Sequence, residues 1–104
     1  MMVAHVHEKT YQDGTTRKVT AVCDRALLGK TFKQGERVLD LKAYRRFYEG
    51  QRVNEGEACT LLAQARSVNA VGEKSVACAL KTLPIDPDAV VRIQGIPHIQ
   101  VYYL

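Results

Sequence analysis

The sequence lacks any apolar run long enough to cross a bilayer. Spanning one takes roughly 18 or more consecutive apolar residues, and polar or charged residues interrupt every stretch well before that length. Residues 1–8 include His5, His7 and Glu8, whereas a signal peptide requires an apolar core in this region. We therefore expect a cytoplasmic protein that is neither exported nor bound to a membrane.

Cysteine is scarce, and its spacing excludes two classes of site. Cys23, Cys59 and Cys78 form no close pair of the kind found in zinc ribbons and dithiol redox motifs. An odd number of separated thiols fits a reducing compartment. Repeats, low-complexity segments and linkers are absent as well, and 104 residues is a common length for one core. The sequence predicts a single domain over residues 1–104, and we expect no cofactor.

The N-terminal half carries strand patterns. Residues 3–8 alternate, residues 18–23 are β-branched and mostly apolar, and an Asp-Gly pair between them is typical of a hairpin turn. Asp24 is placed to cap a short helical turn. Residues 36–41 alternate again, which predicts a third strand.

Two helices and two strands are predicted for the second half. Asn54 begins a capping-box pattern, and apolar residues then recur at helical spacing through Val68. Asn69 is placed to cap a second helix that ends before Pro84, and strands are expected at 89–93 and 98–103. Regular alternation of strands and helices is absent. This order favours an α+β fold in which two adjacent helices pack on one face of a mainly antiparallel sheet, rather than a doubly wound parallel fold.

Positive charge is concentrated in one part of the chain. The net charge is +4, but residues 17–52 hold ten Lys and Arg against four Asp and Glu, a local balance of +6. If folding gathers them on one face, they attract phosphate groups. Aromatic residues interleave with arginines over 44–48, and such rings stack on unpaired bases. The same segment also fits a surface stretch anchored by Phe47, with the arginine heads in water.

The leading hypothesis is therefore a non-enzymatic accessory domain that contacts RNA or a ribonucleoprotein. The residues expected to bind nucleic acid are Lys30, Lys33, Arg37, Tyr44, Arg45, Arg46, Tyr48 and Arg52.

A second set of residues suggests an enzyme instead. Cys23, Asp24, Asn69 and His98 supply the residue types of a thiol nucleophile, its orienting groups and its base. The alternative function is thus a small hydrolase or transferase that depends on cysteine and histidine. Cys23 ends an apolar strand, however, and free cysteine there is commonly a buried core residue. We favour a protein that is not an enzyme.

Two further motifs are incomplete. His5 and His7 face the same side of a predicted strand, a spacing that binds a transition metal when a third ligand such as His98 or Cys23 joins. Without an identified third ligand, we expect no metal. Gly29-Lys30-Thr31 matches the end of a phosphate-binding loop, but Asp24 stands where that loop requires its first glycine.

The last predicted strand suggests a second alternative function. Ile99, Val101 and Tyr103 alternate with Gln100 and Tyr102, and an exposed edge of this kind pairs with another chain. This pattern favours a module for protein interaction, such as one that forms a homodimer.

Several short motifs together resemble an archaeal family, the domain of unknown function 424. They are Val22-Cys23-Asp24, Leu28–Phe32, Phe47–Gly50, Asn69–Gly72 and Gly95–Gln100. The resemblance extends from about Val3 to Gln100 and implies a small cytoplasmic domain without an established activity. The motif positions implied here are Cys23, Asp24, Gly29, Lys30, Phe47, Gly50, Asn69, Gly72, Pro97 and His98. His5, His7 and the apolar tail 101–104 depart from the family pattern.

Overall fold

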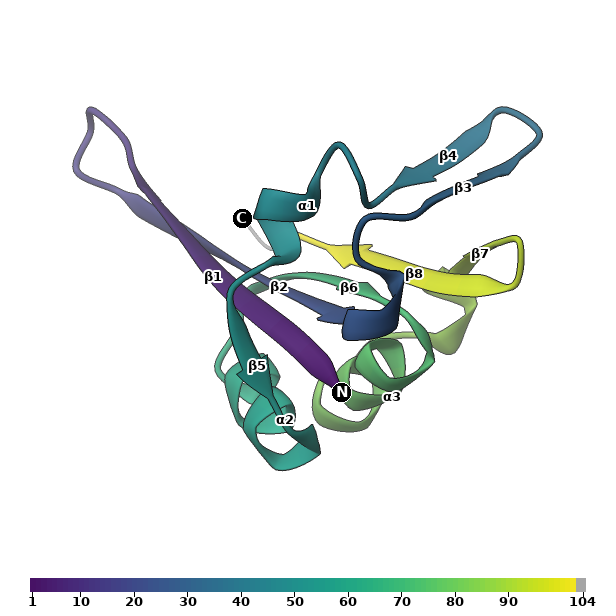
Figure 1. Ribbon diagram of the computed structural model, residues 1–104. Helices are drawn as coiled ribbons and strands as arrows, with labels where there is room; N and C mark the ends of the chain where they lie inside the picture. The colour runs from purple at the N-terminus through teal and green to yellow at the C-terminus, as the bar shows by residue number, and fades with distance from the viewer. Residues whose placement is uncertain (103–104) are drawn as a thin grey trace.

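The computed structural model describes residues 1–102, which form a sheet with elements on both faces (Figure 1). The six strands of this sheet are β1 (Met2–Thr10), β2 (Thr16–Asp24), β5 (Gln51–Val53), β6 (Ser67–Val71), β7 (Val91–Ile93) and β8 (Ile96–Val101). A separate hairpin consists of β3 (Thr31–Gln34) and β4 (Arg37–Asp40). The helices are α1 (Arg45–Tyr48), α2 (Glu55–Ala63) and α3 (Glu73–Thr82), with short 3-10 helices η1 (Arg25–Leu27) and η2 (Pro87–Ala89).

The sheet is antiparallel except at its centre. Its strand order is β5-β1-β2-β6-β8-β7, and among the described strands only the neighbours β2 and β6 run parallel. The predicted β1–β2 hairpin is present and pairs Met2 with Asp24 at one end and Thr10 with Thr16 at the other. The α+β class and the mainly antiparallel sheet are therefore confirmed.

Helices α2 and α3 cover one face of the sheet, as predicted. Ala58 and Leu62 of α2 and Ala79 of α3 are fully buried there, in one cluster with Val22 and Ile99 from the strands. The capping box that starts α2 is present, since Asn54 accepts from the Glu57 amide at 2.8 Å and Glu57 accepts from the Asn54 amide at 3.1 Å. Small side chains on both helices allow this close packing.

The opposite face is covered by α1 and the β3–β4 hairpin. Leu39, Leu41 and Tyr48 are buried there against Cys23 and Val71 of the sheet. In Figure 1, the tips of the β1–β2 and β3–β4 hairpins project on either side of α1. Of these elements, α1 borders both parts of the candidate site.

The segment between α2 and α3 differs from the prediction. Helix α2 ends at Ala63, and residues 67–71 form β6, whose five residues are all buried. Asn69 lies in the middle of this strand and caps no helix, and α3 begins only at Glu73. A strand buried on both faces shows no apolar–polar alternation, so no sequence pattern indicates that a strand begins here. Val68 fits the helical spacing of α2 by coincidence and belongs to β6.

Asp24 caps a helix other than the expected one. Its side chain makes no bond to η1, but its carboxylate accepts from the Lys74 amide at 3.1 Å and from the Ser75 amide at 2.9 Å, at the start of α3. The Ser75 hydroxyl donates to the same carboxylate at 2.8 Å. Gly72 lies against it with φ 106°, and a Cβ at that position would collide with Asp24.

The last strand is not an edge along its whole length. β8 lies between β6 and β7, and its pairing with β7 runs from Ile96 to His98. The two edges of the sheet are β5 and β7, which have three residues each. The predicted edge, from Ile99 to Tyr103, begins where this pairing ends: Ile99, Gln100 and Val101 pair with β6 and not with β7. Tyr103 lies outside the described residues, and pairing with another chain stays a prediction.

Among residues 1–102, no helix combines the length and the apolar character that crossing a membrane requires.

Candidate nucleic-acid interface

Helix α1 is fixed to the sheet by the two histidines of β1. His7 Nε2 donates to the Phe47 carbonyl at 2.6 Å, and His5 Nδ1 donates to the Arg46 carbonyl at 3.2 Å. The two imidazole rings stack with centroids 4.0 Å apart, and the His7 ring stacks on Phe47 at 4.5 Å. One nitrogen of each ring therefore carries a proton and holds α1 in place.

These contacts give the pair of histidines a structural role. Within residues 1–102, no group of three or more His, Cys, Asp or Glu side chains is placed to hold a metal ion. The rings do share one side of β1, as expected, and they contact α1 through the carbonyls of Arg46 and Phe47 and through the Phe47 ring.

Three arginines surround a hollow on one side of α1. Arg25 comes from η1, Arg45 from α1 and Arg52 from β5, and the hollow between them has a volume of about 780 Å³. We call it the arginine hollow. Arg45 Nε is 2.7 Å from a Glu49 carboxylate oxygen, whereas neither Arg25 nor Arg52 forms an ion pair with any residue in the described chain. Among the described residues, Glu49 is the only acidic side chain at its border, so the hollow is a candidate site for anions.

The backbone brings these arginines together. Arg52 is paired with Val3 across β5 and β1, and the Arg25 amide donates to the Met1 carbonyl at 2.8 Å. The N-terminal part of β1 therefore holds η1 and β5 close to each other. Arg25 was not among the predicted binding residues, although it belongs to the basic segment.

A second hollow lies on the other side of α1. It has a volume of about 670 Å³ and is bordered by Tyr44 and Tyr48 from the α1 segment, Asn69 of β6, His98 of β8 and Tyr102. We call it the aromatic cleft. It contains members of both predicted sets, the basic aromatic segment and the Cys-Asp-Asn-His group.

Two polar side chains of the aromatic cleft, Tyr48 and His98, converge on Asn69, which is 4% exposed. Its Oδ1 accepts from the Tyr48 hydroxyl at 2.8 Å and from His98 Nε2 at 3.0 Å. His98 therefore carries its proton on Nε2, and its Nδ1 is an acceptor that bonds to no residue in the described part of the chain. Burial lowers the pKa of His98 below its ordinary value of 6.5, so the imidazole is neutral at pH 7. Burial also raises the pKa of Tyr48, which stays a phenol.

Cys23 and Asp24 do not join Asn69 and His98 in this cleft. Cys23 is 0% exposed, and its thiol donates to the Asp24 carbonyl at 3.3 Å. Burial, with the nearby Asp24 carboxylate, raises the pKa of Cys23 to about 12. A nucleophilic thiol requires a lowered pKa and access to substrate. The surroundings of Cys23 are those of a core thiol, and Asp24 is engaged in capping α3.

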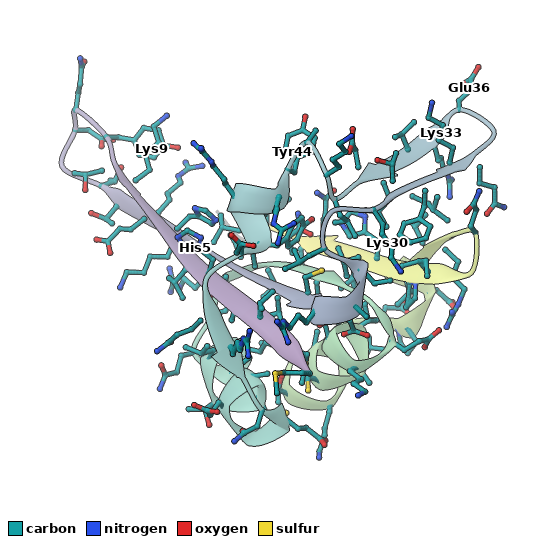
Figure 2. All side chains as sticks on the ribbon, viewed as in Figure 1. His5, Lys9, Lys30, Lys33, Glu36 and Tyr44 are labelled. Carbon is teal, nitrogen blue, oxygen red and sulfur yellow. The ribbon has the colours of Figure 1, made fainter. Side chains whose placement is uncertain are left out.

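The other predicted binding residues are divided between two elements. Lys33 and Arg37 are exposed on the β3–β4 hairpin, with Lys30 exposed at its base, and Figure 2 shows Lys33 on the hairpin and Tyr44 near α1. Arg46 is exposed on α1. Tyr44 is 65% exposed and has a ring free for stacking, whereas Tyr48 is 4% exposed. Tyr48 is therefore a core and network residue, and its expected role in stacking is corrected.

The Gly29-Lys30-Thr31 motif forms no phosphate-binding loop. The Gly29 amide donates to the Leu41 carbonyl at 3.1 Å, and the Lys30 amide donates to the Leu27 carbonyl at 3.1 Å. The Thr31 hydroxyl donates to Asp40 at 3.0 Å. These amides are occupied by the backbone, and a phosphate loop needs them open.

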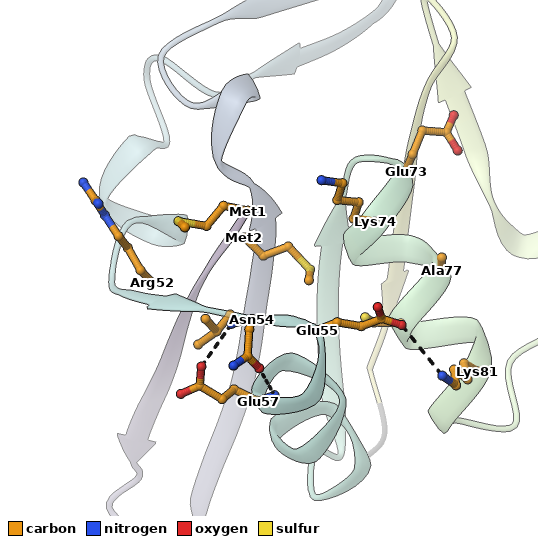
Figure 3. Close-up of a pocket in the computed structure, with 12 residues that line it drawn as sticks. Met1, Met2, Arg52, Asn54, Glu55, Glu57, Glu73, Lys74, Ala77 and Lys81 are labelled. Atoms are coloured by element: carbon orange, nitrogen blue, oxygen red, sulfur yellow. Dashed lines mark hydrogen bonds and ion pairs between the residues drawn. The ribbon is translucent and has the colours of Figure 1, made fainter.

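A third hollow, of about 760 Å³, lies beside α2 and α3 (Figure 3). Its charges balance, because three basic and three acidic side chains border it. They are Arg52, Lys74, Lys81, Glu55, Glu57 and Glu73. The arginine hollow, with three arginines around one glutamate, is the better candidate for phosphate.

Fold and site together define a small α+β domain with a cationic hollow and an aromatic cleft on either side of one short helix. The sequence model for a protein of unknown function, DUF424, matches residues 11–104. The chain belongs to that family. A search of curated proteins finds no match. The crystal structure of an uncharacterized conserved protein from Methanopyrus kandleri is similar, with a TM-score of 0.78 and 24% identity over 97% of this chain and 90% of that chain. That likeness concerns the fold alone.

Proposed function

We propose that this protein is an accessory domain that contacts RNA, alone or in a ribonucleoprotein, through the arginine hollow and the basic side chains around it. The observation that carries the proposal is the convergence of Arg25, Arg45 and Arg52, from three separate elements, around a single glutamate. Arginine binds phosphate in a bidentate manner and keeps its charge at any physiological pH.

Further basic residues extend this surface. Arg46 on α1 and Lys30 at the base of the β3–β4 hairpin are exposed and form no ion pair with any residue from 1 to 102. Lys33 and Arg37 continue it along the hairpin. The hairpin is anchored at its tip, because Gln34 accepts from the Gln94 amide at 2.6 Å. This hydrogen bond holds the hairpin that carries Lys33 and Arg37 against the β7–β8 turn.

The test is RNA binding as a function of salt. We expect total cellular RNA to be retained in filter binding at low salt and released as salt rises, because each bound phosphate releases counterions. Replacing Arg25 and Arg52 together by Gln should weaken binding. It should also make the slope of log K against log salt shallower, by about 0.7 for each phosphate of a single strand that the variant no longer binds.

A matched control removes the same charge elsewhere. Arg66 and Lys81 are exposed, and neither borders the arginine hollow or the aromatic cleft. The Arg66→Gln, Lys81→Gln double variant should bind RNA like the natural chain. No retention at low salt, or equal weakening by both double variants, would contradict the proposal.

A further inference from the structure

The aromatic cleft gathers exposed apolar side chains. Val38, Tyr44 and Tyr102 are 52%, 65% and 54% exposed, and all three border it. They are three of the six large apolar residues exposed in the described part of the chain. Scattered exposed apolar residues need no explanation, but a group of them around one hollow is typical of a binding site.

The cleft also offers hydrogen-bonding groups next to these rings. His98 and Gln100 alternate with Ile99 on β8 and so point to the same side of the sheet, and both border the cleft. With Nε2 bonded to Asn69, the His98 ring keeps Nδ1 as an acceptor. Aromatic faces combined with a few fixed polar groups suit a flat, heterocyclic ligand.

The distance between the cleft and the arginine hollow is set by one helix. Arg45 borders the hollow, while Tyr44 and Tyr48 border the cleft. An α-helix with its side chains is about 10–12 Å across, so a strand that passes over α1 reaches both sites within a few nucleotides. A cationic groove beside aromatic rings is the usual composition of a single-strand site.

We infer that the aromatic cleft receives an unpaired base of an RNA strand whose phosphates lie in the arginine hollow. The inference rests on the proposed function and specifies it: the ligand is single-stranded at the point of contact. Tyr44 and Tyr102 supply the stacking faces. His98 Nδ1 accepts from an amino or imino N–H at the edge of the base.

The test compares two strands that differ only in their bases. The probes are a fluorescein-labelled single-stranded RNA of mixed sequence and an abasic strand of the same length, measured by fluorescence anisotropy at low salt. Stacking contributes about 1–3 kcal/mol per base, which corresponds to roughly a 5- to 150-fold difference in affinity. We expect the natural chain to prefer the strand that carries bases by a factor in this range.

Two variants test whether the preference for the strand with bases arises in the aromatic cleft. Tyr44→Ala should weaken binding of the RNA strand and leave the abasic strand unaffected. Tyr11→Ala is the matched control, because Tyr11 is exposed on the β1–β2 hairpin and does not border the cleft. In NMR spectra, the His98 imidazole resonances should shift with the RNA strand and not with the abasic strand.

The outcomes separate this inference from the proposed function. If neither strand binds, both fail. If both strands bind equally and Arg25→Gln with Arg52→Gln weakens both, the phosphate site stands and the base site is overturned. The base site is also overturned if Tyr44→Ala and Tyr11→Ala bind the RNA strand with the same affinity.

Discussion

Asn69 is the residue on which the polar groups of the aromatic cleft depend. Tyr48→Phe removes one of the two donors to its Oδ1 and keeps the buried ring. We expect this change to lower the free energy of unfolding by about 1 kcal/mol, the usual net contribution of one hydrogen bond. Urea denaturation measures the decrease. Tyr11→Phe removes a hydroxyl from an exposed ring and should have no effect, so equal stability of the two variants would count against the network.

His98 should make the stability of the protein depend on pH. Its pKa is lowered by burial in the folded state, so the unfolded chain binds the proton more tightly. The contribution of neutral His98 to stability is therefore complete above the unfolded value of 6.5 and is lost as the pH falls below it. Between pH 7.5 and 5.5, we expect the free energy of unfolding of the His98→Gln variant to fall less than that of the natural chain, as measured by urea denaturation. An NMR titration midpoint for His98 at or above 6.5 would contradict the assignment.

The thiols provide a direct test of the enzyme alternative. Cys23 is fully buried and its pKa is raised to about 12, whereas Cys59 is half-buried. Iodoacetamide should therefore label Cys59 in the folded protein and Cys23 only after unfolding, with peptide mass spectrometry as the readout. Rapid labelling of Cys23 in the folded protein near neutral pH would restore it as a candidate nucleophile.

At the scale of elements, the junction between β2 and α3 depends on Asp24. Asp24→Ala removes the acceptor for two amides and one hydroxyl at the start of α3. We expect the free energy of unfolding to fall by about 1–2 kcal/mol, as for other helix caps. Asp13→Ala is the control, since Asp13 accepts equivalent bonds from Thr15 within an exposed turn. Similar destabilisation by the two changes, measured by thermal denaturation, would refute a special role for the cap.

Local patterns predicted elements well where sequence neighbours determine them. The β1–β2 hairpin follows from its Asp-Gly turn and its β-branched strands, and the start of α2 follows from Asn54 and Glu57. The five residues of β6 were assigned to helices because a strand covered on both faces gives no periodic signal. Asn69 illustrates the same limit of prediction from local sequence. Its polar side chain suggests a helix cap, but in the structure it accepts hydrogen bonds from Tyr48 and His98 in the cleft.

At the scale of the whole molecule, the sequence indicated the charge but not its arrangement. The basic segment was evident from the local balance of +6. That Arg25 and Arg52 share a hollow depends on the pairing of β5 with β1 and on the bond of Arg25 to Met1. Such interactions join residues far apart in the sequence, and no local pattern encodes them. The choice between Tyr44 and Tyr48 as a stacking residue likewise depended on burial.

The single parallel pair also affects how the chain folds during its synthesis. Strands β5, β1 and β2 come from residues 2–53 and strands β6, β8 and β7 from residues 67–101. Within residues 1–102, β2 and β6 are therefore the only strands that join the two halves of the sheet. During translation, the first half is complete before β6 leaves the ribosome, and the edge of β2 is then without its partner. An unpaired edge promotes aggregation. The edge of β2 is therefore exposed between the emergence of β2 and that of β6, and pairing with β6 then covers it.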